Sequence, residues 1–294
     1  MEYSSKTIWL RLKTPIVRDL VSLLIGPAPW LSPNELPVSI LLGEDGLAFL
    51  YQLDENPESL YTFCKNHSVN FMQLKMYSKF LLSYWFSHAP HCRLLADNIP
   101  IENKQQSISE SNYIVQFDDR IYYLELDYTD YYSSSFNPED FFKLNGVGKL
   151  LDNIQKIDNQ PKLGYPSVAL NIIKKLRLDQ NQLQYATIIR GMLFVPRTEQ
   201  LFISRFNPLA WQGYYSKDWD FWFQSRAYFY VFPGHLSLIS PVKVSYENIV
   251  DFKQVQQIEH GLVAWLIRGE DNYWYETIRI MKVENFDIPP LIKG

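Results

Sequence analysis

Two carboxylates lie two residues apart near the middle of the chain, in the segment Arg120–Thr129, which reads RIYYLELDYT. The aromatic and branched residues of this segment favour a β-strand. Alternate side chains of a strand point to the same face, so Glu125 and Asp127 are predicted to lie together. Hard divalent cations prefer oxygen ligands gathered within a few ångströms. The spacing is therefore typical of a metal site, and an ordinary solvated strand face is the alternative.

A second strand is expected directly before this one. Residues 112–117 (NYIVQF) are followed by a tight turn at Asp118-Asp119, and the pair of runs indicates a β-hairpin. Asn112, at the start of the first run, would then bring an amide oxygen toward the carboxylates. The predicted metal ligands are Glu125, Asp127 and Asn112, with Mg²⁺ as the metal if the site is catalytic.

The surrounding pattern indicates how these strands are supported. Thr14 and Pro15 are typical of a helix start, and an apolar stripe follows until Gly26. Further helical patterns lie near residues 57–66, 71–86 and 141–157. Several β-branched and aromatic runs follow residue 183, which predicts a β-rich C-terminal region. We therefore expect an α/β protein with a helical N-terminal region and α/β core over residues 1–182 and an aromatic, β-rich region over residues 183–294.

Composition limits the possible partners and location. The net charge is −4, so no global positive field would attract DNA, and any contact with nucleic acid requires a local patch. The N-terminus lacks the apolar stretch of a signal peptide, and no run approaches the length of a membrane span. With two cysteines, the default expectation is a reducing cytoplasm and no membrane association.

Two other clusters have residue types that could bind ligands. Cys64, His67, His91 and either His88 or Cys92 have spacings that suit tetrahedral zinc, although two helix ends that carry His and Cys are the simpler interpretation. Residues 211–232 are dense in aromatic side chains, which could stack on bases. A packed core or a protein interface is the commoner use of such residues.

Short blocks along almost the whole chain, in a shared order, resemble a known family. They include TPIVRDL at residues 14–20, SESNY at 109–113, LELDYTDYY at 124–132, RGMLFVP at 190–196 and WYETIR at 274–279. The chain resembles the bacterial Domain-of-Unknown-Function 1853 family, which is assigned to the PD-(D/E)XK nuclease-like superfamily. The resemblance implies a central mixed sheet flanked by helices, with metal-binding acids and a lysine at the site.

This chain departs from the family pattern at three positions. The family aspartate corresponds to Asn112, the family lysine corresponds to Thr129, and the acidic residue expected on the preceding helix falls near Lys79. Glu125 matches the pattern and Asp127 is additional. Some superfamily members supply the lysine from the next helix, where Lys143 and Lys149 are predicted to lie. Lys143 is therefore the candidate catalytic lysine beside Glu125 and Asp127.

Two functional hypotheses follow from this comparison. The favoured one is a degenerate nuclease-like core that binds nucleic acid or a protein partner without catalysis, because the lysine position holds Thr129. The net negative charge slightly favours a protein partner. The alternative is a Mg²⁺-dependent DNA or RNA phosphodiesterase in which the lysine has migrated. Oligomeric state has no sequence signal.

Overall fold

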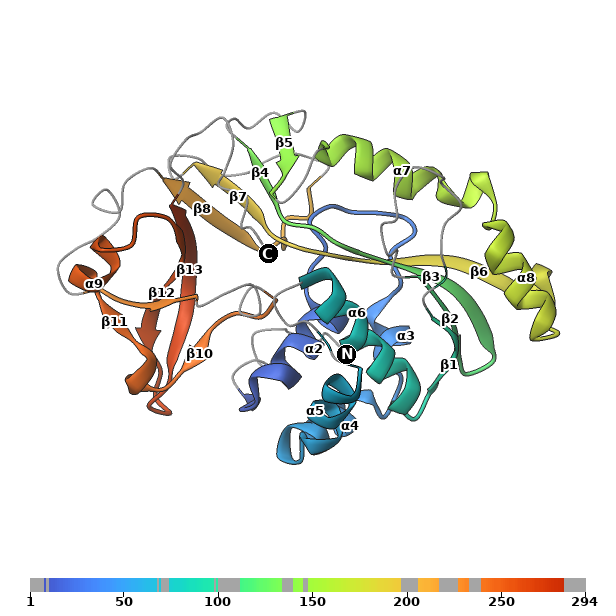
Figure 1. The fold of residues 1–294 in the computed structure, drawn as a ribbon, viewed down its shortest axis with the longest axis horizontal. Helices are drawn as coiled ribbons and strands as arrows, with labels where there is room; N and C mark the ends of the chain where they lie inside the picture. The colour runs from blue at the N-terminus through green and yellow to red at the C-terminus, as the bar shows by residue number, and fades with distance from the viewer. Residues whose placement is uncertain are drawn as a thin grey trace.

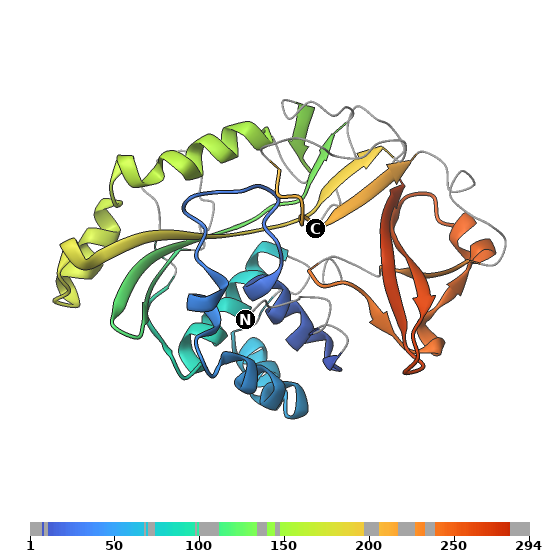
Figure 2. The same cartoon turned by 180° about the vertical axis from the view of Figure 1, so that it is seen from behind.

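The computed structural model describes residues 8, 11–67, 69, 74–97, 99, 112–133, 140–144, 148–196, 206–216, 227–232 and 239–282, which form an α/β fold with two mixed sheets (Figures 1 and 2). The helices of these residues are α2 (Pro15–Ile25), α3 (Val38–Leu42), α4 (Gly46–Glu55), α5 (Glu58–Asn66), α6 (Leu74–His88), α7 (Leu150–Leu163), α8 (Ser167–Lys175) and α9 (Phe252–Gln256), with short 3₁₀ helices η2 (Gln180–Gln182) and η4 (Tyr246–Asn248). None of these helices has the length and apolar character needed to cross a membrane.

The strands form two sheets, and two neighbouring segments of the chain run from the first sheet into the second. The first sheet has the order β1-β2-β3-β6, with β3 and β6 parallel and the other neighbours antiparallel. The second has the order β11-β9-β12-β13-β8-β7-β4-β5, and β10 also pairs with β13. The strands are β1 (Cys92–Ala96), β2 (Asn112–Phe117), β3 (Arg120–Tyr128), β4 (Tyr131–Ser133), β5 (Phe141–Lys143), β6 (Leu183–Arg190), β7 (Leu193–Pro196), β8 (Gln212–Ser216), β9 (Tyr228–Val231), β10 (Lys243–Val244), β11 (Val250–Asp251), β12 (Gly261–Arg268) and β13 (Trp274–Lys282).

The first sheet is the middle layer of a three-layer arrangement. Helices α2 to α6 lie on one side of it, and α7 and α8 lie on the other (Figures 1 and 2). Leu124 and Leu126 of β3 belong to the core that packs against the N-terminal helices. Tyr123 belongs to a smaller core with Ala169 and Ile173 of α8. Because alternate residues of β3 serve opposite cores, the face that carries Glu125 and Asp127 is the face covered by α7 and α8.

Helix α2 anchors the N-terminal layer and begins where the sequence predicts. The two residues that precede its first turn are held by Asp54, whose carboxylate accepts from the amides of Lys13 and Thr14 at 2.9 and 2.7 Å. Pro15 occupies the first helical position, where a missing N–H costs nothing. The apolar face of α2 is fully buried, which fixes this helix against the first sheet.

The two sheets are joined by a pair of parallel crossings. Strand β3 continues into β4, and β6 continues into β7, so the two chains pass from one sheet to the other side by side. Thr129 donates its amide to the Arg190 carbonyl at 3.0 Å, and Met192 donates its amide to Asp130 Oδ1 at 2.8 Å. Gly191 has φ +142°, and a Cβ there would lie 1.9 Å from the Thr129 oxygen. The boundary proposed after residue 182 falls just before β6, so strands from both sides of it pair in both sheets.

We expect Asp130→Asn to remove a pH dependence of stability. Asp130 is buried, and burial raises its pKa from 3.8 to about 6. Between these values the folded protein holds a proton that the unfolded chain has lost, so stability falls as pH rises through this window. The asparagine variant lacks this titration, and it should lose about 2 kcal/mol less than the wild type between pH 4.5 and 7.5.

Urea unfolding at a series of pH values measures this difference. Asp19 is also buried with a pKa near 6, but it titrates equally in both proteins and cancels in the comparison. Asp119→Asn, at an exposed turn position, is the matched control and should keep the wild-type slope. Identical slopes in the wild type and Asp130→Asn would contradict the prediction.

Candidate functional site

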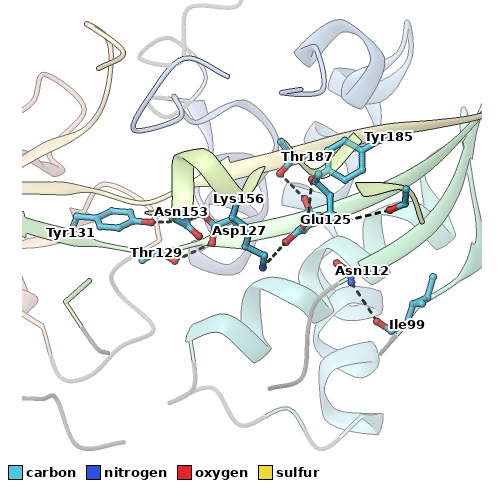
Figure 3. A network of polar contacts seen from close by, with 12 residues as sticks. Ile99, Asn112, Glu125, Asp127, Thr129, Tyr131, Asn153, Lys156, Tyr185 and Thr187 are labelled. Atoms are coloured by element: carbon cyan, nitrogen blue, oxygen red, sulfur yellow. Dashed lines mark hydrogen bonds and ion pairs between the residues drawn. The ribbon is translucent and has the colours of Figure 1, made fainter. Parts of the chain in front are cut away.

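The hairpin of β2 and β3 brings the three predicted ligands to one face of the first sheet. Asn112 is the direct register partner of Glu125, and residues opposite each other in an antiparallel pair share a face. Asp127 lies two residues along β3, on the same side. Asp118 adopts φ +48°, which supports the tight turn between the strands. Figure 3 shows the three side chains on this face, as the sequence predicts.

Glu125 is held by partners from two other elements. It is 7% exposed, and its Oε2 accepts from the Tyr185 hydroxyl of β6 at 3.0 Å. Its Oε1 lies 3.5 Å from Lys156 Nζ of α7. Burial raises the pKa of Tyr185, and the nearby Glu125 charge raises it further, so Tyr185 remains a donor. The Glu125 side chain is therefore positioned by a hydroxyl donor and lies next to a cation.

Asp127 is bound by neutral donors. Its Oδ2 accepts from Asn153 Nδ2 at 2.5 Å, and its Oδ1 accepts from Thr129 Oγ1 at 3.1 Å. Burial raises the pKa of Asp127, and the charge of Glu125 adds to this effect, whereas Lys143 opposes it. The two carboxylates are therefore close enough to repel each other. Thr129 thereby orients Asp127.

Asn112 has a buried oxygen that lacks a protein partner. Its side chain is fully buried, and its Nδ2 donates to the Ile99 carbonyl at 3.4 Å. Its Oδ1 accepts no hydrogen bond, although buried polar atoms are nearly always satisfied. An amide oxygen in this state, opposite Glu125, is suited to ligating a hard cation. The oxygen atoms of Asn112, Glu125 and Asp127 are therefore of the type that Mg²⁺ prefers. Without Asn112, the described residues contain no group of three His, Cys, Asp or Glu side chains that could hold a metal.

The helix predicted over residues 141–157, which was expected to carry the lysine, was wrong over its first part. Residues 141–143 form β5, which pairs with β4, and α7 begins at Leu150. Lys143 therefore lies on a strand, and Lys149 precedes the helix. Strand pairing to Tyr131–Ser133 outweighs the moderate helical periodicity of this segment. Lys143 still lies near enough to Asp127 for its charge to lower the pKa of that carboxyl.

The lysine beside the acids is Lys156, which sequence reasoning missed. Its amine is the cation that reaches Glu125, and its side chain is 48% exposed (Figure 3). Asn153, which binds Asp127, lies three residues earlier in α7, and residues at this spacing share a helix face. The helix predicted over residues 141–157 already contained both residues. Spacing within α7 was therefore the available signal.

Lys79 is not positioned to replace the expected helical acid. It lies on α6, and its backbone carbonyl accepts from the Tyr113 hydroxyl at 2.9 Å. Tyr113 belongs to the core on the side of the sheet opposite Glu125 and Asp127. Burial lowers the pKa of the Lys79 amine. The helix before the sheet thus contributes no carboxylate at this position.

The zinc hypothesis fails on geometry. His67 Nδ1 contacts the Phe63 carbonyl at 2.8 Å, and the His67 ring packs on Phe63. Cys64 is buried, and burial raises the pKa of its thiol to about 11, which disfavours a thiolate ligand. Of the other candidate ligands, Cys92 Sγ contacts only His91, through its Nε2 at 3.3 Å. No metal-binding group of three such residues occurs in the part of the chain that the structure covers.

The aromatic cluster is only partly described. Residues 217–226 lie outside the described residues. Of the remainder, Phe229 is fully buried in the core with Val255 and Val263, and Tyr215 is buried against Phe194. These side chains therefore belong to hydrophobic cores on the second sheet, which is the commoner role of a dense aromatic segment.

Comparison with known proteins places the whole chain in one family. The model of the family described as domain of unknown function (DUF1853) matches residues 9–283. Neither a curated protein nor a solved structure matches the chain. The match extends from the N-terminal helices to the last described strand, so it includes both sheets and the carboxylate face. The chain belongs to the DUF1853 family.

Proposed function

We propose that this protein is a divalent-metal-dependent phosphodiesterase that acts on nucleic acid through the carboxylate face of the first sheet. The observation that carries the proposal is the convergence of Asn112, Glu125 and Asp127, with Lys156 Nζ 3.5 Å from Glu125. A mixed sheet between two helical layers supports it, because the PD-(D/E)XK resemblance implies this arrangement. Lys156 takes the part of the migrated lysine.

Each residue has a separate role in this proposal. Glu125, Asp127 and the free oxygen of Asn112 would hold Mg²⁺, which lowers the pKa of bound water and polarises a phosphodiester. Lys156 presents a half-exposed cation that can stabilise negative charge on a phosphate oxygen. Tyr185 and Asn153 fix the rotamers of Glu125 and Asp127, so that the oxygen atoms need little reorganisation.

A second candidate is a core that binds nucleic acid or a protein partner without catalysis. One observation favours it: the four carboxylate oxygens of Glu125 and Asp127 each have a protein donor or cation, so the pair is stable without a metal. In that case, Lys156 and the nearby Lys143 would contact an anionic surface of the partner directly. The test below separates the two candidates.

Calorimetric titration of Mn²⁺ and Mg²⁺, followed by incubation with plasmid and single-stranded DNA and RNA, tests the first candidate. We expect metal binding and metal-dependent cleavage, both lost in Glu125→Gln/Asp127→Asn, which preserves side-chain size. The matched control, Asp119→Asn, removes an exposed carboxylate of the same hairpin and should behave as the wild type. Binding of nucleic acid with no cleavage and no metal requirement would refute the phosphodiesterase and support the second candidate.

A further inference from the structure

A cavity lies away from the carboxylate face, between α2 and the C-terminal strands. Its volume is about 530 Å³, within the range of small-molecule sites. Helix α2 supplies one wall, and the segment around β10 supplies the other. Its polar lining includes Arg18, Asp19, Tyr77, Ser240, Lys243 and Tyr273.

Arg18 is a buried cation whose hydrogen bonds are incomplete. It is 6% exposed, and its Nε has no hydrogen-bond partner. Burial lowers the pKa of Arg18, but an arginine stays charged at neutral pH. The charges of Asp19 and Asp54 partly compensate that of Arg18, but a buried donor without a hydrogen-bond partner is costly, and native proteins rarely retain one. A ligand with an acceptor oxygen in this cavity would contact Arg18, which contributes to its lining.

Lys243 provides a second cation in the same cavity. It is 7% exposed, lies 3.6 Å from Asp271, and packs over the Tyr273 ring at 4.8 Å. Burial lowers the pKa of its amine, and the charge of Arg18 lowers it further. The two cations are therefore close enough to repel each other. One ligand with more than one negative charge would relieve this repulsion.

The carboxylates near Arg18 and Lys243 are occupied by other donors. Asp19 accepts from the Ser240 amide at 3.1 Å and from the Tyr77 hydroxyl at 3.0 Å. Asp54 accepts from the two backbone amides at the start of α2, and Asp271 accepts from the Tyr275 hydroxyl at 2.5 Å. These three carboxylates offset the charges of Arg18 and Lys243, but their interactions leave Arg18 Nε without a hydrogen bond.

We propose that this cavity binds a nucleoside monophosphate, with the phosphate on Arg18 and Lys243 and the base among tyrosine rings. A phosphate offers two charges and three terminal oxygens, which match a guanidinium fork and a separate ammonium better than one carboxylate does. Tyr61 and Tyr273 line the cavity and are 42% and 38% exposed, so their rings can stack on a planar base. The site is independent of the metal ligands on β3.

Calorimetry with AMP, GMP, CMP and UMP, and separately with adenosine and inorganic phosphate, tests the assignment on the full chain. At least one mononucleotide should bind, and the nucleoside and the phosphate alone should each bind about tenfold more weakly or worse. Arg18→Met should weaken binding about 10- to 100-fold, because charge-assisted hydrogen bonds are lost. The matched control, Arg93→Met, replaces an exposed arginine on β1 and should bind as the wild type.

Thermal unfolding distinguishes a variant that has lost ligand binding from one that has lost its fold. Without ligand, Arg18→Met should melt close to the wild type, because removing a buried guanidinium with an unbonded Nε offsets the lost attraction to Asp19 and Asp54. The mononucleotide should then raise the melting temperature of the wild type and not that of Arg18→Met. Tyr61→Ala, at the exposed rim, should weaken the nucleotide and leave phosphate binding unchanged.

The proposal is overturned if none of the four nucleotides binds at millimolar concentration, or if Arg18→Met binds as Arg93→Met does. A ligand-free Arg18→Met that melts well below the wild type would also overturn it, because Arg18 would then be satisfied by the protein. Glu125→Gln/Asp127→Asn should bind the mononucleotide normally. Failure of the phosphodiesterase proposal and failure of this one are therefore distinguishable.

Discussion

Lys156→Met should lower the rate of metal-dependent phosphodiester cleavage by about 10²- to 10³-fold, the usual cost of removing one charge-stabilising group. The methionine keeps the length of the side chain and removes the ammonium that lies 3.5 Å from Glu125. Metal affinity should be retained or improved, because a cation that competes for Glu125 is gone. The measurement is cleavage under saturating Mn²⁺, with the metal affinity determined in parallel.

Three matched lysine variants decide which amine acts. Lys162→Met changes an exposed lysine near the end of the same helix and should cleave as the wild type. Lys143→Met should have a smaller effect than Lys156→Met, because Lys143 influences Asp127 only through its charge. Lys149→Met should be close to neutral. Undiminished cleavage by Lys156→Met would remove the lysine from the proposed mechanism.

Arg190→Met should destabilise the protein by about 3–5 kcal/mol, the cost of breaking a buried ion pair by removing one partner. Arg190 is 3% exposed, and its Nη1 lies 2.5 Å from Glu35 Oε1. It also donates to the Leu23 and Leu24 carbonyls at 2.7 and 3.0 Å, which are unsatisfied groups at the end of α2. One side chain therefore ties α2, the Glu35 segment and β6 together.

Substitution of Glu35 tests whether the loss in Arg190→Met comes from the broken ion pair. Burial raises the pKa of Glu35, whereas the Arg190 charge lowers it, so losing Arg190 leaves a buried carboxyl that favours its proton. Arg190→Met/Glu35→Gln should recover part of the lost stability in urea unfolding. Arg93→Met, an exposed arginine on β1, should change stability by less than about 0.5 kcal/mol. A loss for Arg190→Met no larger than that of Arg93→Met would contradict the prediction.

The local features of the site follow from short-range sequence signals. Residues 112–117 and 120–128 form the predicted hairpin, because the turn residues and the β-branched and aromatic runs agree. The two-residue period of β3 then places Glu125 and Asp127 on one face, and the hairpin register places Asn112 beside Glu125. Helix α2 likewise begins at Pro15, as its start signals predict.

Several features depended on contacts between distant segments. The first β-branched run after residue 183 divides at Gly191-Met192 into β6 and β7, because these residues cross from one sheet to the other beside Thr129 and Asp130. The helix expected from residue 141 begins only at Leu150, because Phe141–Lys143 pairs with β4. The local sequence pattern cannot reveal either pairing, because the strands that pair lie in separate segments of the chain.

The sequence by itself determined the strand with two carboxylates, its hairpin partner and the presence of threonine rather than lysine at position 129. These features depend on residue identity and on the alternation of side chains along a strand. Only the tertiary structure decided that Lys156 meets Glu125, that Tyr185 orients it, and that Arg18 and Lys243 share a cavity. Those contacts join segments far apart in the chain, and packing of whole helices and sheets sets their geometry.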